Sequence, residues 1–129
     1  MKFKLIPLAM IIAATIFFVP RSQAADKILK SGSFVGQSGH NTHGSVRIIE
    51  RSGKVFVILA KDFFHDGAPD PKIAFGKNGF IKGTIIGKLQ KLTGEQHYAV
   101  PTSLDIRNFN QIYVWCEQSA VPLGVASVQ

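Results

Sequence analysis

The chain has one cysteine, Cys116, which directly follows its only tryptophan, Trp115. Both lie in residues 111–117, whose β-branched and aromatic composition predicts a β-strand. Because side chains alternate along a strand, we expect Cys116 on the apolar face and Trp115 and Glu117 on the opposite face. A thiolate can be oxidised reversibly or can ligate a metal. Cys116 is therefore the first candidate for redox chemistry, with Trp115 and Glu117 as its neighbours.

Two interpretations of Cys116 stay open at this point. A free cysteine in an apolar strand is often a small buried hydrophobe. Alternatively, the end of the strand, beside a charged residue and close to a loop, leaves the sulfur reachable for oxidation or ligation. A lone cysteine cannot form an internal disulfide, although it could link two chains into a dimer.

Two histidines suggest a second kind of chemistry. His40 and His43 lie three residues apart in the polar, glycine-flanked stretch 36–44 and could chelate a metal ion if that loop curls. Adding Cys116 would give a mixed Cys/His site. The alternative is that both histidines are solvated or bonded to the backbone. A blue-copper centre is disfavoured, because no histidine follows Cys116 and both methionines lie in the first ten residues.

Three aspartates, Asp62, Asp66 and Asp70, recur at intervals of four around a proline-rich stretch. Calcium takes oxygen ligands of this kind, but the spacing differs from that of an EF-hand loop. We favour turn-capping roles for them, since aspartate is a common turn residue.

The N-terminus predicts an export signal. Lys2 and Lys4 are followed by an apolar run over residues 5–19 and by small residues up to Ala24. The run is shorter than the ~20 residues that span a bilayer, so we expect no permanent membrane anchor. Cleavage after Ala24 would remove residues 1–24 and leave an exported domain, residues 25–129, periplasmic or secreted.

Charge argues against a nucleic-acid partner. The predicted mature domain keeps 12 of the 15 basic residues against 8 acidic ones, about +4 in all, and the charges are scattered singly. The sequence also lacks the nucleophile elbow and the Ser-Lys pattern of common hydrolases.

Glycine and proline recur every few residues after residue 30, and the apolar runs between them are short. This pattern predicts a single all-β domain, an antiparallel β-sandwich or a partly open barrel. We expect the last strand to lie at an edge, with Pro122 at its start. The expected strands cover residues 27–30 with 33–35, 45–50, 54–59, 72–75, 84–89, 96–100, 111–117 and 122–128.

An ordered set of short motifs supports a family resemblance. They are Gly-Ser-Phe (32–34), Ser-Gly-His (38–40), Gly44, Asp-Phe-Phe-His-Asp-Gly-Ala-Pro-Asp-Pro (62–71), Gly-Glu-Gln-His-Tyr (94–98) with Pro101, Trp-Cys-Glu (115–117) and Pro-Leu-Gly-Val-Ala (122–126). In this order the chain resembles a DM13 domain from about residue 30 to its end.

The resemblance implies a β-rich extracellular or periplasmic electron-transfer module. It implies that Cys116 acts as a bare thiol or holds a prosthetic group such as haem, and that a separate redox partner protein exists. His40 matches a motif position of the family, whereas His43 stands where a small hydroxyl residue is expected. The sequence itself identifies no cofactor, and both haem and a metal ion stay open.

Two hypotheses follow. In the first, an exported DM13-type module transfers electrons through Cys116, with Trp115 shielding the sulfur, Glu117 disfavouring the thiolate and His40 as a second ligand or proton acceptor. In the second, the domain is a non-catalytic module that binds a glycan, a peptide or another envelope protein through its loops, and Cys116 is structural.

Overall fold

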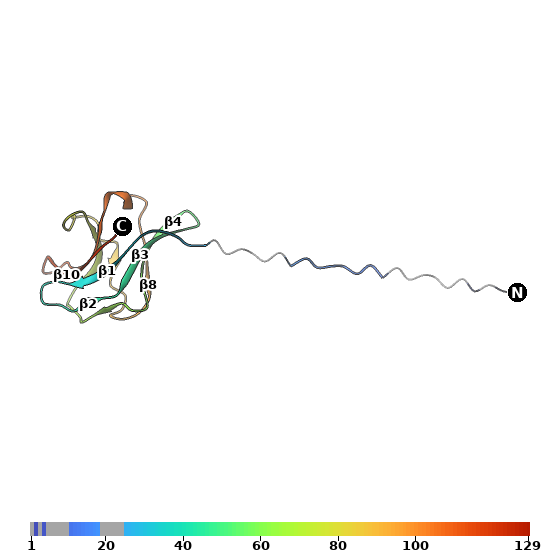
Figure 1. The fold of residues 1–129 in the computed structure, drawn as a ribbon, viewed down its shortest axis with the longest axis horizontal. Helices are drawn as coiled ribbons and strands as arrows, with labels where there is room; N and C mark the ends of the chain where they lie inside the picture. The colour runs from blue at the N-terminus through green and yellow to red at the C-terminus, as the bar shows by residue number, and fades with distance from the viewer. Residues whose placement is uncertain (1, 3, 5–10, 19–24) are drawn as a thin grey trace.

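A computed structural model describes residues 2, 4, 11–18 and 25–129 (Figure 1). Most of the predicted signal peptide, including its cleavage site, lies outside these residues. Residues 11–18 form neither helix nor strand and are exposed. Within the described parts of the chain, no helix has the length and hydrophobicity needed to cross a membrane.

The domain is all-β, as predicted, and its main sheet has eight antiparallel strands in the order β7-β6-β9-β10-β1-β3-β4-β8. The sheet curls until it nearly closes into a barrel, so the partly open barrel is the architecture that forms. The strands are β1 (Lys27–Gly36), β3 (Ser45–Arg51), β4 (Lys54–Leu59), β6 (Pro71–Gly76), β7 (Gly87–Lys88), β8 (Gln96–Ala99), β9 (Gln111–Cys116) and β10 (Val121–Ser127). A 3-10 helix, η1 (Ile106–Asn108), precedes β9.

The long strand β1 lets the sheet curl, because its first part pairs with β3 and its last part pairs with β10. At the opposite side, the two edges are joined by Gln90, which follows β7. Its backbone N–H donates to Tyr98 Oη (2.8 Å), and its side-chain Nε2 donates to the carbonyl of His97 (2.7 Å). Since Tyr98 and His97 belong to β8, these bonds hold the open seam of the barrel together.

One continuous apolar core fills the barrel. Each of the longer strands contributes side chains from its inward face, as alternation predicts. In β9 the inward residues Ile112, Val114 and Cys116 all belong to this core, whereas Trp115 and Glu117 are more exposed. The expected division of β9 into two faces is therefore confirmed.

Three strand predictions differ from the structure. The first strand is unbroken: Gly32 lies in it opposite Val46 of β3, and its backbone packs so closely that a Cβ there would overlap the Ser127 carbonyl oxygen. The stretch 84–89 keeps only the two-residue strand β7, since the Thr84 hydroxyl bonds both the N–H and the C=O of Phe75.

The last strand was predicted at an edge, and this was wrong: β10 lies between β9 and β1. Pro122 is tolerated because β1 pairs only with Gly124, Val125 and Ala126, beyond the register shift between Pro122 and Gly124.

A separate two-stranded sheet, β2 (Thr42–His43) with β5 (Phe64–His65), joins two loops at one end of the barrel. The three aspartates, which were expected to cap turns, each accept a backbone N–H from a segment distant in the sequence. Asp62 accepts the N–H of Ser45 (2.9 Å), Asp66 accepts that of Asn41 (2.9 Å), and Asp70 accepts that of Gln118 (3.1 Å).

Candidate functional site

Cys116 lies at the very end of β9, between Pro71 of β6 and Val121 of β10. Its thiol is free and only 2 % of the residue is exposed, within the continuous apolar core. The next residues, 117–120, form an exposed turn. The sulfur is therefore enclosed, but it is separated from solvent by the end of a strand rather than by the centre of the sheet.

Trp115 projects from the other face of β9. Its ring stacks on Phe80, with centroids 3.7 Å apart and an interplanar angle of 4°, and it meets Tyr113 edge-on at 6.1 Å. Trp115 thus anchors an aromatic cluster on the outside of the barrel. The apolar core, on the inner face of the sheet, encloses the sulfur.

Glu117 is the charged neighbour of the thiol and its side chain is 53 % exposed. Its carboxylate lies 3.7 Å from Lys72 Nζ, which also lies 3.3 Å from Asp70 Oδ1. The backbone N–H of Glu117 donates to the carbonyl of Asp70 (3.2 Å). Lys72 therefore offsets part of the negative charge at this end of β9.

The surroundings of Cys116 do not fit a haem bound through its sulfur. A surface pocket of about 590 Å³ lies beside this strand end, and its lining includes Trp115, Glu117 and Phe80 but not Cys116. Because Cys116 is packed on the opposite, inward face, a porphyrin could reach its sulfur only by displacing core side chains.

A second group of reactive side chains surrounds the small β2–β5 sheet. Thr42 and His65 are paired residues of this sheet, and the His65 ring is fully buried. Thr42 Oγ1 donates its hydrogen to the carbonyl of Leu123 (3.0 Å), so His65 Nδ1 is the donor in its 2.8 Å bond to Thr42 Oγ1. Among the described residues, His65 Nε2 then has no hydrogen-bond partner. Burial lowers the pKa of His65.

Asp66 connects His65 to His40. Its Oδ1 lies 2.8 Å from His40 Nδ1 and 3.7 Å from His65 Nδ1, while Oδ2 accepts the N–H of Asn41. The bond from Asn41, followed by that from His40, holds the pKa of Asp66 below its ordinary value. One donor atom from each of His40, His65 and Asp66 lies within 4.8 Å of the others.

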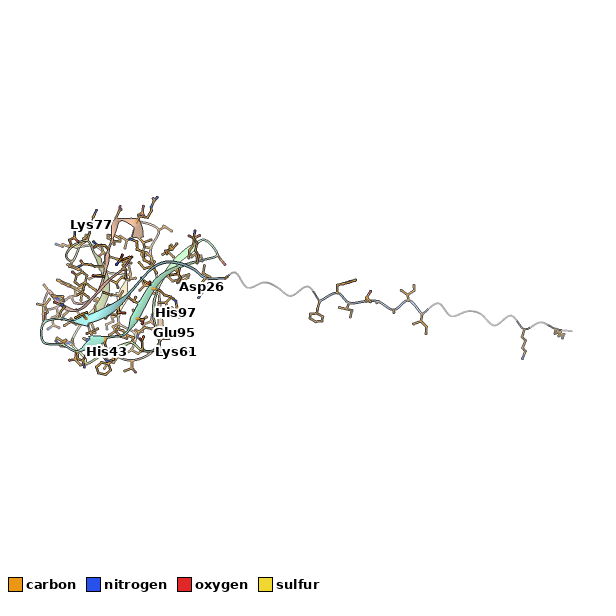
Figure 2. The ribbon with its side chains drawn as sticks, viewed as in Figure 1. Asp26, His43, Lys61, Lys77, Glu95 and His97 are labelled. Atoms are coloured by element: carbon orange, nitrogen blue, oxygen red, sulfur yellow. The ribbon has the colours of Figure 1, made fainter. Side chains whose placement is uncertain are left out.

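His43 points elsewhere. Alternation along β2 buries Thr42 and exposes His43, whose ring stacks on Phe64 with centroids 5.1 Å apart; Figure 2 shows His43 at the surface. The group around His40 includes neither His43 nor Cys116. His65, which lies outside the strands that the sequence predicts, is the histidine that joins His40. Strands of only two residues carry no periodicity that could have revealed this pairing.

This group lies at the same end of the barrel as Cys116. Leu123, whose carbonyl accepts the Thr42 hydroxyl, is two residues along β10 from Val121, the partner of Cys116. The adjacent loop is fixed there as well, since Ser38 Oγ donates to the carbonyl of Pro122.

Comparison with known proteins supports the resemblance found in the sequence. No curated protein and no solved structure matches the chain. A family model described as electron transfer DM13 matches residues 33–128, which includes every strand from β2 to β10 and the single cysteine. The chain therefore belongs to the DM13 family of electron-transfer domains.

Proposed function

We propose that this protein is an exported electron-transfer module whose redox group is the thiol of Cys116. The family match carries the proposal, because it includes the only sulfur of residues 25–129 that can undergo reversible thiol chemistry. The basic start and the apolar run over residues 5–19 support export.

A bare thiol is the form that the packing favours, since the surroundings of Cys116 leave no room for a haem. The partner is then a protein that carries a disulfide. The Cys116 thiol loses its proton, and the thiolate attacks one sulfur of that disulfide. A bond forms between Sγ and this sulfur while the partner's S–S bond breaks, and the partner's second sulfur leaves as a thiolate. Cys116 is oxidised and the partner is reduced.

A single cysteine cannot resolve this mixed disulfide within the chain. A thiolate of another protein must attack it, which releases Cys116 reduced and completes the exchange. Separate donor and acceptor proteins are therefore part of the proposal, and two copies of this chain joined through Cys116 would be an inactive product.

The enclosure of Cys116 requires a local opening for such an attack. Only the last rung of β9, opposite Pro71 and Val121, and the exposed turn 117–120 need to separate from the barrel. Strand ends and turns open at a lower free energy than the whole domain does. Opening at this end would expose the sulfur and leave the central core packed.

The burial of Cys116 also favours a second candidate. If the thiol serves only as core packing, the domain is a binding module that recognises a partner through its surface. The two functions differ in whether the thiol reacts while the domain is folded.

The distinguishing experiment uses glutathione disulfide as a probe of thiol exchange. The folded protein is incubated with the probe, and the product is measured by intact mass spectrometry, with Cys116→Ala as the control. We expect one glutathione adduct, absent from the control and removed by added thiol, while the circular dichroism spectrum stays native. An adduct that forms only after denaturation would refute the redox proposal and favour the binding module.

A further inference from the structure

The group formed by His40, His65 and Asp66 has no part in the thiol chemistry proposed above. Its three side chains come from two loops that the β2–β5 sheet holds together. We propose that these residues form a binding site for a divalent transition-metal ion of the zinc and copper class. The proposal stands independently of the role of Cys116.

The ligand types suit such an ion. Imidazole nitrogens bind zinc, copper and nickel, and one carboxylate completes a set of two nitrogens and one oxygen. Calcium and magnesium prefer sites made of oxygen alone. In the described residues the Asp66 carboxylate lies within 4 Å of the two histidines and forms an ion pair with no lysine or arginine, so no fixed cation occupies it.

Two of the three separations between ligand atoms, those that involve Asp66 Oδ1, are close to those of a tetrahedral site, and the third is within 4.8 Å. Zinc-to-ligand bonds of about 2.0–2.1 Å place neighbouring ligand atoms about 3.3–3.4 Å apart. His65 Nδ1 lies 3.7 Å from Asp66 Oδ1, and His40 Nδ1 lies 2.8 Å from the same oxygen. To bind an ion, the His65–Asp66 distance must shorten and the His40–Asp66 distance must lengthen, each by roughly half an ångström. The side chains of His40 and Asp66 are 29 % and 36 % exposed and can make this adjustment.

The rest of the site is already oriented. The N–H of Asn41 fixes Asp66 Oδ2 and leaves Oδ1 directed at the histidines. Such supporting bonds hold ligands in position in known metal sites. An ion on His65 Nδ1 would replace the bond from this nitrogen to Thr42 Oγ1, 2.8 Å away, so the Thr42 hydroxyl would have to move outward or join the ion as a further oxygen ligand. The exposed side, at His40, leaves a position for water.

His65 is also costly to keep as a histidine. A fully buried imidazole with one nitrogen unpartnered in the described residues is costly, and an apolar side chain would fill the same space without that cost. A ligand role for Nδ1 would give this position a reason to hold a histidine; the unpartnered nitrogen itself is Nε2, on the other side of the ring.

Metal binding by the full chain, purified without an affinity tag and stripped of metal, tests the proposal. Zinc chloride is titrated calorimetrically, and cobalt chloride is titrated by visible absorption. We expect one ion per chain, and affinity at least ~10-fold weaker in His40→Ala and in Asp66→Asn, the scale seen when a group of a metal site is lost. Both variants change partly exposed side chains and should leave the fold intact.

Two controls make the result specific. His97 of β8 forms a comparable exposed pair with Glu95, 3.7 Å apart, and His43 is an exposed histidine of β2, next to Thr42; Figure 2 labels all three side chains. Affinity should stay within about twofold of the wild type in His97→Ala and His43→Ala, well below the loss expected at a ligand.

Three results would overturn the proposal: no saturable binding by the wild type, unchanged affinity in His40→Ala, or an equal loss in the control variants. Cobalt bound through Cys116 would show an intense sulfur-to-metal charge-transfer band, and that too would overturn it. Binding that survives in Cys116→Ala separates this site from the thiol, so each proposal can fail without the other.

Discussion

Replacing Cys116 with serine tests how the thiol is packed. Only 2 % of Cys116 is exposed, and its side chain lies in the continuous apolar core. A serine hydroxyl at this position is buried among apolar groups. Burial of an unpartnered hydroxyl costs about 1–3 kcal/mol in proteins, so Cys116→Ser should lower the free energy of unfolding by that amount. Alanine brings no polar group and loses only packing, so Cys116→Ala should be the more stable of the two variants.

The assay is urea denaturation under reducing conditions, followed by the fluorescence of Trp115, the only tryptophan. The dependence on urea should be the same for all three proteins, so that a shift of the midpoint reports stability alone. If Cys116→Ser were as stable as the wild type, or more stable than Cys116→Ala, the thiol would not lie in apolar surroundings and the packing argument would be wrong.

Two further predictions concern the barrel. Burial raises the pKa of Tyr98 to about 12, whereas a tyrosine in the unfolded chain titrates near pH 10. The stability gained by burying the neutral phenol is therefore complete below pH 10. It is lost as the pH rises from 10 to about 12. The free energy of unfolding should fall by about 2–3 kcal/mol over this range. In the variant Tyr113→Phe, Tyr98 is the only tyrosine left, so titration of its absorbance against pH reports its pKa alone. A midpoint near pH 10 would contradict the burial. Gly44→Ala should cost more than about 2 kcal/mol, because φ is +110° and the new Cβ would lie 2.5 Å from Phe63 Cα. Gly53→Ala, with φ +76° and open space around the new Cβ, should cost only about 1 kcal/mol; thermal melts of the two variants measure the difference, and equal losses would contradict the packing at Gly44.

The fold class could be predicted because the longer strands show their two faces in the sequence. The β3–β4 hairpin and the inward face of β9 follow from alternation and from the short Ser52–Gly53 connection. Pairing between distant strands leaves no such pattern. The place of β10 in the middle of the sheet depends on the register between Pro122 and β1, which no local signal contains.

The candidate site was predicted in part for the same reason. His40 was identified from its spacing to His43, but alternation in β2 turns His43 outward. The residue that meets His40 is His65, which is brought there by a pairing of two-residue strands across more than twenty residues of sequence. Asp66 was expected to cap a turn; one of its oxygens accepts the N–H of Asn41 in the other loop, and the other contacts His40.

The reactivity of Cys116 in the folded domain is the measurement that tests the central claim most directly. Alkylation by iodoacetamide is followed by mass spectrometry at increasing urea concentrations below the unfolding transition, and the rate gives the free energy of the opening that exposes the sulfur. The account predicts an opening free energy well below that of global unfolding, with little dependence on urea, because only the end of β9 and the turn 117–120 separate. Labelling that requires the full free energy of unfolding and shows its full urea dependence would contradict the account, since the thiol would then be inaccessible to any partner.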